Sequence, residues 1–265
     1  MDILKTEFYK LTKTSGKPSP EPKEAGEVLA GFAGRLAGSY PAADEKIKAQ
    51  EKRAAVKTYC DNQENHSRLI CDLGRFQNAS FEDYERTQPN QKRIAAAVEK
   101  FSRDDFKANP RNLVLFGKVG TGKDHLITAA AKAVSRQGVS VRYFIAERFF
   151  ADCSDRFKSN QTEKDFLRKY ITPDVLIFSD PIKKKWLKES PTDAGHDRFC
   201  SVIKQRAQQN RPTWLTGNLF SPDLKTGISQ LETIFGSDVV RRITAGAVLC
   251  WCDWPCFTKA SEVIK

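Results

Sequence analysis

Three glycines and a lysine stand at a spacing that suits phosphate binding. The segment Gly117-Lys-Val-Gly-Thr-Gly-Lys123 matches the pattern G-x-x-x-x-G-K, and it lies between an apolar run and a helical pattern. Glycines let the backbone curl so that its N–H groups face phosphate oxygens, and the start of the following helix adds positive potential. Lys123 then supplies a point charge for the β- and γ-phosphates of a nucleotide such as ATP. The predicted nucleotide-binding residues are Gly117, Lys118, Val119, Gly120, Thr121, Gly122, Lys123, Asp124 and His125.

The positions that normally hold Mg²⁺ depart from the usual pattern. A Ser or Thr is expected directly after the lysine, and Asp124 stands there instead. In the apolar run that ends Phe-Ser-Asp-Pro, Ser179 occupies the place of the metal-binding Asp and Asp180 that of the catalytic Glu. Since one acid is lost at Ser179 and one is gained at Asp124, we predict that Asp124 and Asp180 together hold Mg²⁺. The opposing argument is repulsion between Asp124 and the phosphates, so ATP binding with slow hydrolysis is the expectation.

Apolar strands that alternate with helices position these residues. We predict strands at 113–116, 139–145, 174–178, 212–215 and 248–251, and helices at 94–101, 124–134, 146–158 and 196–209. This alternation is typical of a mostly parallel sheet with helices on both faces, a three-layer α/β fold. It assigns residues 81–265 to a nucleotide-binding domain and residues 1–80 to an amino-terminal adaptor segment.

The amino-terminal segment is weakly patterned. Lys17-Pro-Ser-Pro-Glu-Pro is typical of a linker, and Gly31, Gly34 and Gly38 weaken any helix, whereas 42–59 is a helical candidate. We expect a partner-binding arm that is partly disordered or helical. A zinc site would take Cys60, His66 and Cys71, but a fourth ligand is not evident and the spacing differs from close C-x2-C pairs.

Composition narrows the class of protein and its partners. The chain has 265 residues, 40% hydrophobic and 29% charged, with no apolar run near the roughly 18 to 20 residues that cross a bilayer and no secretory signal, which predicts a cytoplasmic protein. Its seven cysteines are irregularly spaced and are expected to be reduced. The net charge of +11 favours a polyanionic partner or marks a merely soluble basic protein.

A resemblance to a known family becomes specific when the motifs are taken in order. From about Phe81 to Phe257, the chain resembles the DnaC/IstB/DnaI-type helicase loader ATPases of the AAA+ class. The matching runs are Gly-Lys-Val-Gly-Thr-Gly-Lys-Asp-His-Leu, Gly-Val-Ser-Val-Arg, Asp-Val-Leu-Ile-Phe-Ser-Asp, Arg-Pro-Thr-Trp-Leu-Thr-Gly-Asn, Val-Arg-Arg-Ile and Asp-Trp-Pro-Cys-Phe. The resemblance implies an AAA+ domain without a separate carboxyl-terminal helical lid.

The resemblance also implies roles for single residues. Lys123 and Asp180 resemble the Walker A lysine and the Walker B acid, and Asn218 resembles the sensor 1 residue that orients the attacking water. Arg242 resembles the arginine finger that a neighbouring subunit inserts toward the γ-phosphate. The Arg expected after Phe257 is missing, and Lys259 is not equivalent to it.

The function implied is a switch driven by ATP and Mg²⁺ that delivers or remodels a replicative helicase on single-stranded DNA, with self-association through the nucleotide. An IstB-like helper ATPase for a transposase and a hydrolysis-deficient nucleotide-bound adaptor remain open as alternatives. Turnover assays with and without DNA distinguish the enzyme from the adaptor.

Candidate contacts to nucleic acid follow the acidic strand. The run Lys183-Lys-Lys-Trp-Leu-Lys is typical of a loop that binds phosphates through Lys183, Lys184 and Lys185 and stacks a base on Trp186, or of a solvated surface loop. Phe157 with Lys158 is a second candidate, whereas Phe149 and Phe150 are expected in the core. Near the last strand, the cysteines at 250, 252 and 256 are expected to be small buried residues, with a metal as the alternative.

Overall fold

The computed structural model describes residues 22–155, 162–183, 186, 194–219, 221 and 223–256, without the side chains of 22–46 and Tyr59. By its contacts the chain divides into two units, Met1–Tyr59 and Cys60–Lys265. The boundary between adaptor and nucleotide-binding domain that the sequence suggests at residue 80 stays a prediction.

Helix α2 accounts for the described part of the first unit. It runs over Pro22–Leu73 and therefore begins 20 residues before the predicted helix at 42–59. Gly31, Gly34, Gly38 and Pro41 lie within it. Inside a helix, glycine costs about 1 kcal/mol and proline about 3 kcal/mol relative to alanine. The stretch from residue 31 to residue 41 is therefore the less stable part of α2 by intrinsic helix propensity.

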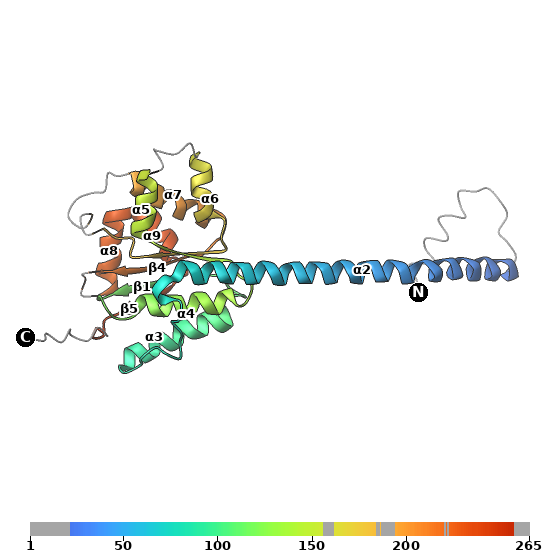
Figure 1. The fold of residues 1–265 in the computed structure, drawn as a ribbon, viewed down its shortest axis with the longest axis horizontal. Helices are drawn as coiled ribbons and strands as arrows, with labels where there is room; N and C mark the ends of the chain where they lie inside the picture. Colours follow the sequence, from blue (N-terminus) through green and yellow to red (C-terminus); the bar gives the residue numbers. More distant parts are fainter. Residues whose placement is uncertain are drawn as a thin grey trace, which may run out of the picture. The chain divides into compact units, whose positions relative to one another are not determined.

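A five-stranded sheet organises the second unit. All neighbouring strands are parallel, in the order β2-β3-β4-β1-β5 (Figure 1). The strands are β1 (Leu113–Gly117), β2 (Val141–Ile145), β3 (Val175–Ser179), β4 (Thr213–Asn218) and β5 (Val248–Cys252). Each predicted strand is present, and the carboxyl ends of all five meet at one edge of the sheet because the strands are parallel.

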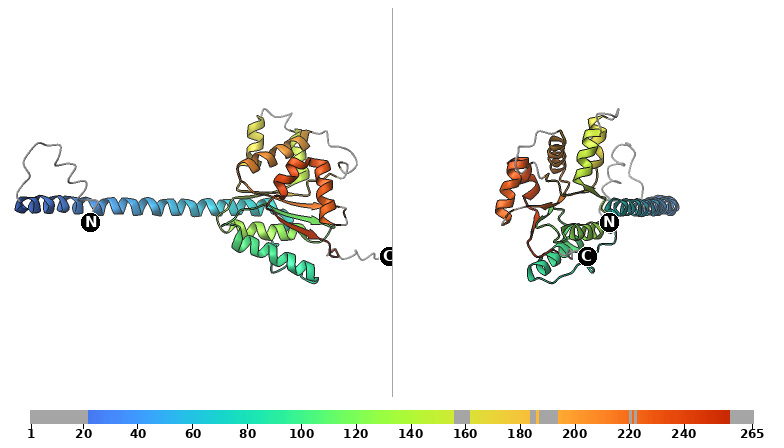
Figure 2. Two further views of the ribbon diagram at one scale, coloured as in Figure 1. Left: turned by 180° about the vertical axis from the view of Figure 1, so that it is seen from behind. Right: turned by 60° about the vertical axis from the view of Figure 1, so that its left-hand side comes forward.

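Helices cover both faces of the sheet, as Figures 1 and 2 show. On one face lie α3 (Pro89–Lys100), η2 (Phe101–Asp105) and α4 (Lys123–Ser135), together with the end of α2 and η1 (Gly74–Phe76). On the other face lie α5 (Ala146–Asp155), α6 (Glu163–Ile171), α7 (Ala194–Gln208), α8 (Leu224–Phe235) and α9 (Ser237–Thr244). The predicted three-layer α/β fold is confirmed.

Alternation along the strands divides the core into two parts. Leu113 and Leu115 of β1 belong to the cluster under α3 and α4, whereas Val114 and Phe116 belong to the cluster under the opposite helices. This is the period of two that a strand imposes on its side chains. Because β1 is buried throughout, its sequence is a continuous apolar run and not an alternation of apolar and polar residues.

Arg206 of α7 fixes the beginnings of β3 and β4 without any carboxylate partner. Its side chain is fully buried and donates hydrogen bonds to the carbonyl oxygens of Pro173, Asp174 and Pro212 at 2.9, 3.0 and 2.5 Å. Burial lowers the pKa of this guanidinium to about 9. A buried charge is tolerated here because all of its donor nitrogens have oxygen acceptors.

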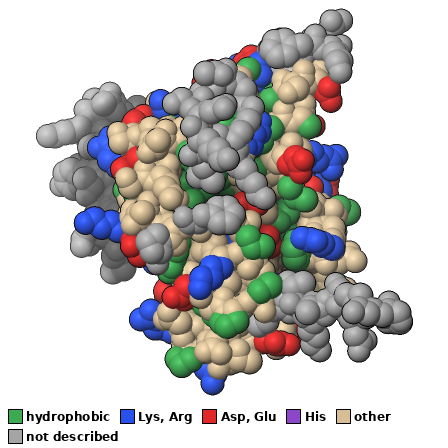
Figure 3. Space-filling view, turned by 90° about the vertical axis from the view of Figure 1, so that its left-hand side faces the viewer, with side chains coloured by type: hydrophobic (Ala, Val, Ile, Leu, Met, Phe, Trp, Pro, Cys, Tyr) green, Lys and Arg blue, Asp and Glu red, His purple; other side chains and the backbone are tan. Residues whose placement is uncertain are grey.

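The charges of the described surface are mixed. On the face in Figure 3, Lys and Arg side chains lie apart from one another, with Asp and Glu among them. The net charge of +11 therefore does not gather into one basic patch on the described residues of that face. Among the described helices, none has both the length and the apolar character of a bilayer-crossing segment.

Candidate functional site

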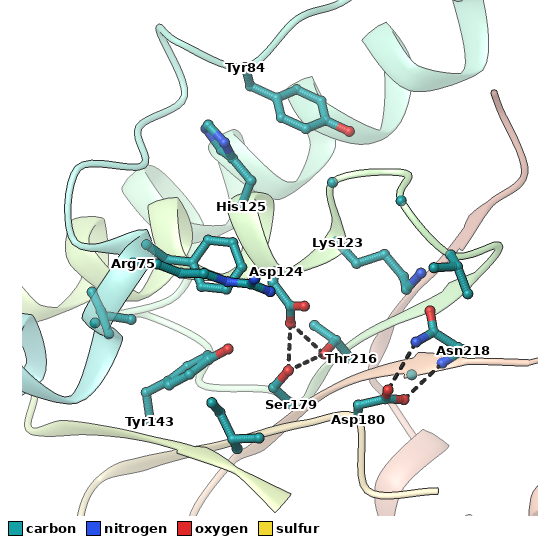
Figure 4. Close-up of a pocket in the computed structure, with 18 of the residues that line it drawn as sticks. Arg75, Tyr84, Lys123, Asp124, His125, Tyr143, Ser179, Asp180, Thr216 and Asn218 are labelled. Carbon is teal, nitrogen blue, oxygen red and sulfur yellow. Dashed lines mark hydrogen bonds between the residues drawn. The ribbon is translucent and has the colours of Figure 1, made fainter. Parts of the chain in front are cut away.

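A cleft of about 790 Å³ opens at the edge where the parallel strands end. The loop after β1 forms one wall, and the ends of β2, β3 and β4 form its floor (Figure 4). The turn after α2 and the segment before α3 complete the lining, through residues that include Arg75 and Tyr84. Its volume lies within the roughly 300 to 1,000 Å³ of small-molecule and cofactor sites.

The loop after β1 has the backbone that the glycine pattern predicts. Gly120 and Gly122 have φ of 76° and 79°, a left-handed conformation that glycine adopts without strain. At Gly117, φ is 140°, and a Cβ would lie 2.1 Å from the carbonyl oxygen of Cys252. The loop therefore requires glycine for two separate reasons, backbone conformation and close approach of β5.

Lys123 lies over the loop that precedes it. Its Nζ donates hydrogen bonds to the carbonyl oxygens of Lys118 and Gly117 at 2.5 and 3.3 Å. The side chain is buried, and this burial lowers its pKa, while the charges of Asp124 and Asp180 act in the opposite sense. A phosphate that enters the cleft would exchange carbonyl acceptors for anionic ones, which bind an ammonium group more strongly.

Two distant segments hold the tip of the loop. The Thr121 carbonyl accepts hydrogen bonds from the Tyr84 hydroxyl at 3.0 Å and from the Trp254 Nε1 at 2.8 Å. Next to them, His125 Nε2 lies 2.7 Å from the Ser80 carbonyl oxygen, and its ring is 5.3 Å from that of Tyr84. His125 thus contacts the segment before α3, which agrees with a packing role.

Asp124 forms the centre of a hydrogen-bonded cluster at the ends of β3 and β4. Its Oδ1 accepts hydrogen bonds from the hydroxyls of Ser179 at 2.7 Å and Thr216 at 2.8 Å, and Thr216 also lies 3.3 Å from Ser179 (Figure 4). Figure 4 shows the second carboxylate oxygen on the side of Lys123. The end of β3 therefore lacks the carboxylate of the usual pattern, but Asp124 of α4 places a carboxylate beside it. In the same way, α4 lacks the usual hydroxyl after the lysine, but Ser179 of β3 places a hydroxyl beside Asp124.

Asp180 and Asn218 form a pair beside this centre. The Asn218 Nδ2 donates to Asp180 Oδ2 at 2.9 Å, and its backbone N–H donates to Oδ1 at 3.3 Å. Asp180 has φ of 54°, an uncommon conformation for a residue other than glycine, which marks functional or turn positions. The structure thus brings Lys123, Asp124, Asp180 and Asn218 to one cleft, as their predicted roles require.

Arg242 does not line this cleft. It lies in the last turn of α9, where its Nε is 3.3 Å from Asp238 Oδ1, and it lines a separate pocket of about 350 Å³ with Arg111 and Arg211. These residues precede β5, β1 and β4, so the pocket is at the opposite edge of the sheet. A role for Arg242 in the same chain's cleft is excluded, and its role toward a neighbouring subunit stays a prediction.

The prediction that Trp186 offers a ring for base stacking is wrong. Its side chain is 3% exposed and packs edge-on against Phe150, His196 and Phe235. The Nζ of Lys183 lies 4.1 Å from the ring centroid of Phe150 and 4.9 Å from that of Trp186, so this lysine covers an aromatic cluster. An aromatic residue next to lysines can bury its ring while the lysines remain at the surface.

The other nucleic-acid candidates lie outside the described residues. They are Phe157, Lys158, Lys184 and Lys185. Phe149 and Phe150 are buried in the core under α5 and α7, as expected.

The candidate metal-binding cysteines do not form sites in the described part of the chain, where no group of three His, Cys, Asp or Glu side chains converges. Cys60 and Cys71 are exposed, and His66 Nδ1 lies 3.1 Å from Ser135 Oγ. Cys250 and Cys252 are buried, as expected for small core residues, and burial raises the pKa of Cys250 to about 12. Cys256 is exposed, so the expectation of burial is wrong for this residue, which lies beyond the end of β5.

Sequence reasoning missed several residues of the cleft, among them Thr216, Tyr143, Tyr84 and Arg75. Thr216 and Tyr143 could have been found from strand alternation, because Thr216 shares a face with Asn218 and Tyr143 lies on the strand next to Ser179. Tyr84 and Arg75 carry no such signal, since the loops that bring them to the cleft are far from it in sequence.

The order of the parallel strands and the loop after β1 are those of a P-loop nucleotide-binding domain. The sequence pattern of the family described as "IstB-like ATP binding protein" matches residues 45–220, about two-thirds of the chain. The chain belongs to this family of ATP-binding proteins.

Replicative helicase loaders are among its relatives. The chain is 23% identical over 195 residues to the replicative helicase loader DnaC of Buchnera aphidicola subsp. Acyrthosiphon pisum, which covers 71% of this chain and 73% of that protein. It is 20% identical over 217 residues to the replicative helicase loader DnaC of Escherichia coli K12, which covers 78% and 83%.

Solved structures show the same fold. A crystal structure of the DnaC helicase loader matches 67% of this chain and 98% of its own, with a TM-score of 0.59 and 22% identity. The structure of DnaI matches 68% and 91%, with a TM-score of 0.52 and 21% identity. At such identities these matches establish the architecture alone.

Proposed function

We propose that this protein is an ATP-dependent switch that delivers or remodels a replicative helicase on single-stranded DNA. One observation supports the nucleotide part most directly: Lys123, Asp124, Asp180 and Asn218 line one cleft at the edge of the sheet that binds ligands in parallel α/β proteins. Membership of an ATP-binding family and the helicase loaders among the relatives support the rest.

The side chains of the cleft fit a magnesium ion that is bound together with a nucleotide. Mg²⁺ commonly binds one or two carboxylates, substrate phosphates and several waters, so it needs no three-residue cage. Asp124 would supply its second oxygen, because the first one already accepts two hydroxyl hydrogens. Asp180 supplies the other carboxylate. When bound, the ion would offset the negative charge of the phosphates.

The protein's own groups divide the remaining work. Backbone N–H groups of Gly117 to Asp124 bind the phosphates, and Lys123 turns from its carbonyl acceptors to the β- and γ-oxygens. Asn218 holds Asp180 through two hydrogen bonds, so that a water between them and the γ-phosphate would be oriented for in-line attack. Both oxygens of Asp180 accept hydrogen bonds from Asn218, so the pair has a fixed mutual orientation.

In this proposal, the protein responds to bound nucleotide by self-association. The cleft lies at the carboxyl ends of the strands, whereas Arg242 precedes β5 at their amino ends. A head-to-tail contact between two copies would place Arg242 of one copy against the nucleotide of the next. In this proposal bound ATP orders such an assembly on DNA, and hydrolysis releases it.

Two other functions remain to be distinguished from this one. The family match also supports a helper ATPase for a transposase. The exchange at positions 124 and 179 supports an adaptor that binds nucleotide without useful turnover, because a carboxylate beside the phosphates can hold the ion too tightly in its ground state.

Turnover with its candidate partners tests the proposal. We expect ATPase activity that rises when single-stranded DNA and the host's replicative helicase are both present, and that is lost in Lys123→Ala. Stimulation by a transposase in place of the helicase would support the helper ATPase. If ATP binds but is not hydrolysed under any of these conditions, the result supports the nucleotide-binding adaptor.

A further inference from the structure

The second pocket gathers positive charge at the amino ends of the strands. It has a volume of about 350 Å³, and the described residues of its lining include three arginines and no aspartate or glutamate. The arginines are Arg111, Arg211 and Arg242, which precede β1, β4 and β5. The buried guanidinium of Arg206 donates to the carbonyl oxygen of Pro212, which also lines the pocket, and the charge of Arg211 contributes to the lowered pKa of Arg206. Positive charges are thus close enough here to repel one another.

The surrounding negative groups offset only part of this charge. Neither Arg111 nor Arg211 has an ion-pair partner in the described part of the chain. Arg242 Nε lies 3.3 Å from Asp238, but the same carboxylate also lies 3.4 Å from Lys204. The carboxyl ends of α7 and α9 add only about half a negative charge each. Positive charge therefore remains in the pocket for an incoming anion.

Arg111 and Arg211 can offer their outer nitrogens to such an anion. The guanidinium carbon of Arg111 lies 5.5 Å from the ring centroid of Phe101, so a cation–π contact orients this side chain. Its Nε is buried, and its two Nη nitrogens donate no hydrogen bond to a described residue. Arg211 donates one long hydrogen bond, at 3.4 Å, to the carbonyl oxygen of Ile171. A planar guanidinium with available N–H groups can bind two oxygens of one phosphate.

A terminal phosphate fits three guanidiniums better than a phosphate within a DNA strand. It carries a charge of about −1.5 to −2 and offers three oxygens, whereas a phosphate within a strand carries one charge and offers fewer unesterified oxygens. The chain's own nucleotide is out of reach, because the cleft lies at the other ends of strands that are roughly 16 to 20 Å long. The phosphate must therefore come from another molecule.

We propose that this pocket receives the γ-phosphate of a nucleotide held by a second copy of the chain, with Arg111 and Arg211 as phosphate-binding residues beside Arg242. This inference rests on the proposed function, in which one copy meets the nucleotide of the next. It adds that three separate segments of the chain bind the phosphate together. A nucleotide without a γ-phosphate should then join two copies less well.

The test compares nucleotide-dependent self-association of the full chain with that of Arg111→Gln and of Arg211→Gln. Sedimentation velocity with Mg²⁺ and a non-hydrolysable ATP analogue gives the dissociation constant of the assembly, and ADP replaces the analogue in a second series. We expect each variant to weaken the assembly roughly tenfold or more, as for the loss of a hydrogen bond to a charged group. Affinity of the cleft for the analogue, measured on dilute monomer, should stay unchanged, which also shows that the variant is folded.

Arg241→Gln is the matched control. Arg241 precedes Arg242 in α9 and is exposed, and it does not line the pocket. This variant loses the same charge and should assemble like wild type. An equal loss of assembly in Arg241→Gln would mean that general surface charge is responsible, and would overturn the inference.

A mixture of two variants tests which surfaces meet. Lys123→Ala keeps the pocket but should not bind nucleotide, whereas Arg111→Gln combined with Arg211→Gln binds nucleotide but lacks a working pocket. Neither should assemble alone, and the mixture should form pairs.

Three results would contradict the proposal in different ways. If wild type binds ATP but stays monomeric, or if both single variants assemble normally, the inference is overturned and the nucleotide cleft stands. If the variants assemble normally but lose affinity for single-stranded DNA, the pocket binds nucleic acid and the inference is also overturned. If wild type binds no ATP, the proposed function fails, and this inference fails with it.

Discussion

The two sides of the cleft relate differently to the sequence pattern. On the phosphate side, Gly117 to Lys123 match the pattern residue by residue, and the backbone has the conformation that the glycines allow. On the side that we propose holds the metal ion, called the metal side below, Asp124 and Ser179 each depart from the pattern when considered alone. Together they form a hydrogen-bonded pair in which the usual carboxylate and hydroxyl have exchanged elements.

This difference teaches which property each side must preserve. Phosphate binding by backbone N–H groups depends on local conformation, so it ties residue types to sequence positions. A metal site depends on which oxygens meet in space, and side chains from α4, β3 and β4 can supply them in more than one arrangement. A pattern read position by position detects the first requirement and misses the second.

Lys123→Ala breaks the phosphate side and should have the largest effect. Hydrogen bonds to charged groups contribute about 1.5 to 3 kcal/mol, so ATP affinity should fall roughly ten- to a hundredfold. Calorimetric titration with ATP measures this loss. Because Nζ donates to carbonyls of its own loop, a melting curve should accompany the titration. An affinity within twofold of wild type would contradict the role of Lys123.

Reversal of the exchange breaks and then restores the metal side. Asp124→Ser removes the proposed carboxylate ligand and leaves Thr216 and Ser179 without their shared acceptor, so the Mg²⁺ midpoint for ATP binding should rise tenfold or more. Asp124→Ser combined with Ser179→Asp returns a carboxylate to the same place and should recover most of that loss. Fluorescence titration with a nucleotide analogue gives all the midpoints.

The double variant tests whether Asp124 and Ser179 act as a pair, because the effects of substitutions at interacting residues do not add. If the Mg²⁺ midpoint of the double variant is as high as that of Asp124→Ser alone, or higher, Asp124 and Ser179 do not act as a pair. In EDTA, Asp124→Ser should bind ATP at least as well as wild type, since it removes a charge that repels the phosphates.

Tyr84→Phe sharpens the comparison on the phosphate side. Its hydroxyl and the Trp254 indole both donate to the Thr121 carbonyl, so one of two supports of the loop is lost. We expect ATP affinity to fall about three- to tenfold, from a net hydrogen-bond contribution of about 0.5 to 1.5 kcal/mol. The Mg²⁺ midpoint should stay unchanged. A shifted Mg²⁺ midpoint with normal ATP affinity in EDTA would mean that Tyr84 acts on the metal side of the cleft and not on the phosphate side.

Proton uptake provides the smallest effect. Burial lowers the pKa of Lys123 in the free protein, and the phosphates of a bound nucleotide would raise it again. ATP binding should therefore take up a fraction of a proton at alkaline pH, and this fraction should decrease as the pH is lowered and Lys123 of the free protein gains its proton. Calorimetry in buffers of different ionisation enthalpy measures it. Proton release at alkaline pH would contradict the role of Lys123.

The fold was largely predictable because its strands are buried on both faces. Continuous apolar runs such as Leu113–Phe116 indicate central strands of a parallel sheet, and each predicted strand is present. Helices α6, α8 and α9 were not predicted. They are short, at 9, 12 and 8 residues, so each has only about two or three turns over which a period can be recognised.

The site was predictable only where function depends on local sequence. The phosphate-binding loop, Asp180 and Asn218 follow from motifs. Asp180 and Asn218 line the cleft, as does the loop except at Gly117, Lys118 and Thr121. The Asp124 and Ser179 pair required the relative positions of α4, β3 and β4, which a sequence does not display. Trp186 was misjudged because neighbouring lysines suggest exposure, whereas its burial depends on Phe150 and Phe235 from distant helices.

The affinity of the wild-type protein for ATP, measured by calorimetry with Mg²⁺ and with EDTA, tests the central claim most directly. The account predicts tight binding with Mg²⁺, weaker binding in EDTA, and a loss of both in Lys123→Ala. A wild-type protein that binds neither ATP nor ADP, or that binds them equally well with the lysine replaced, would contradict it.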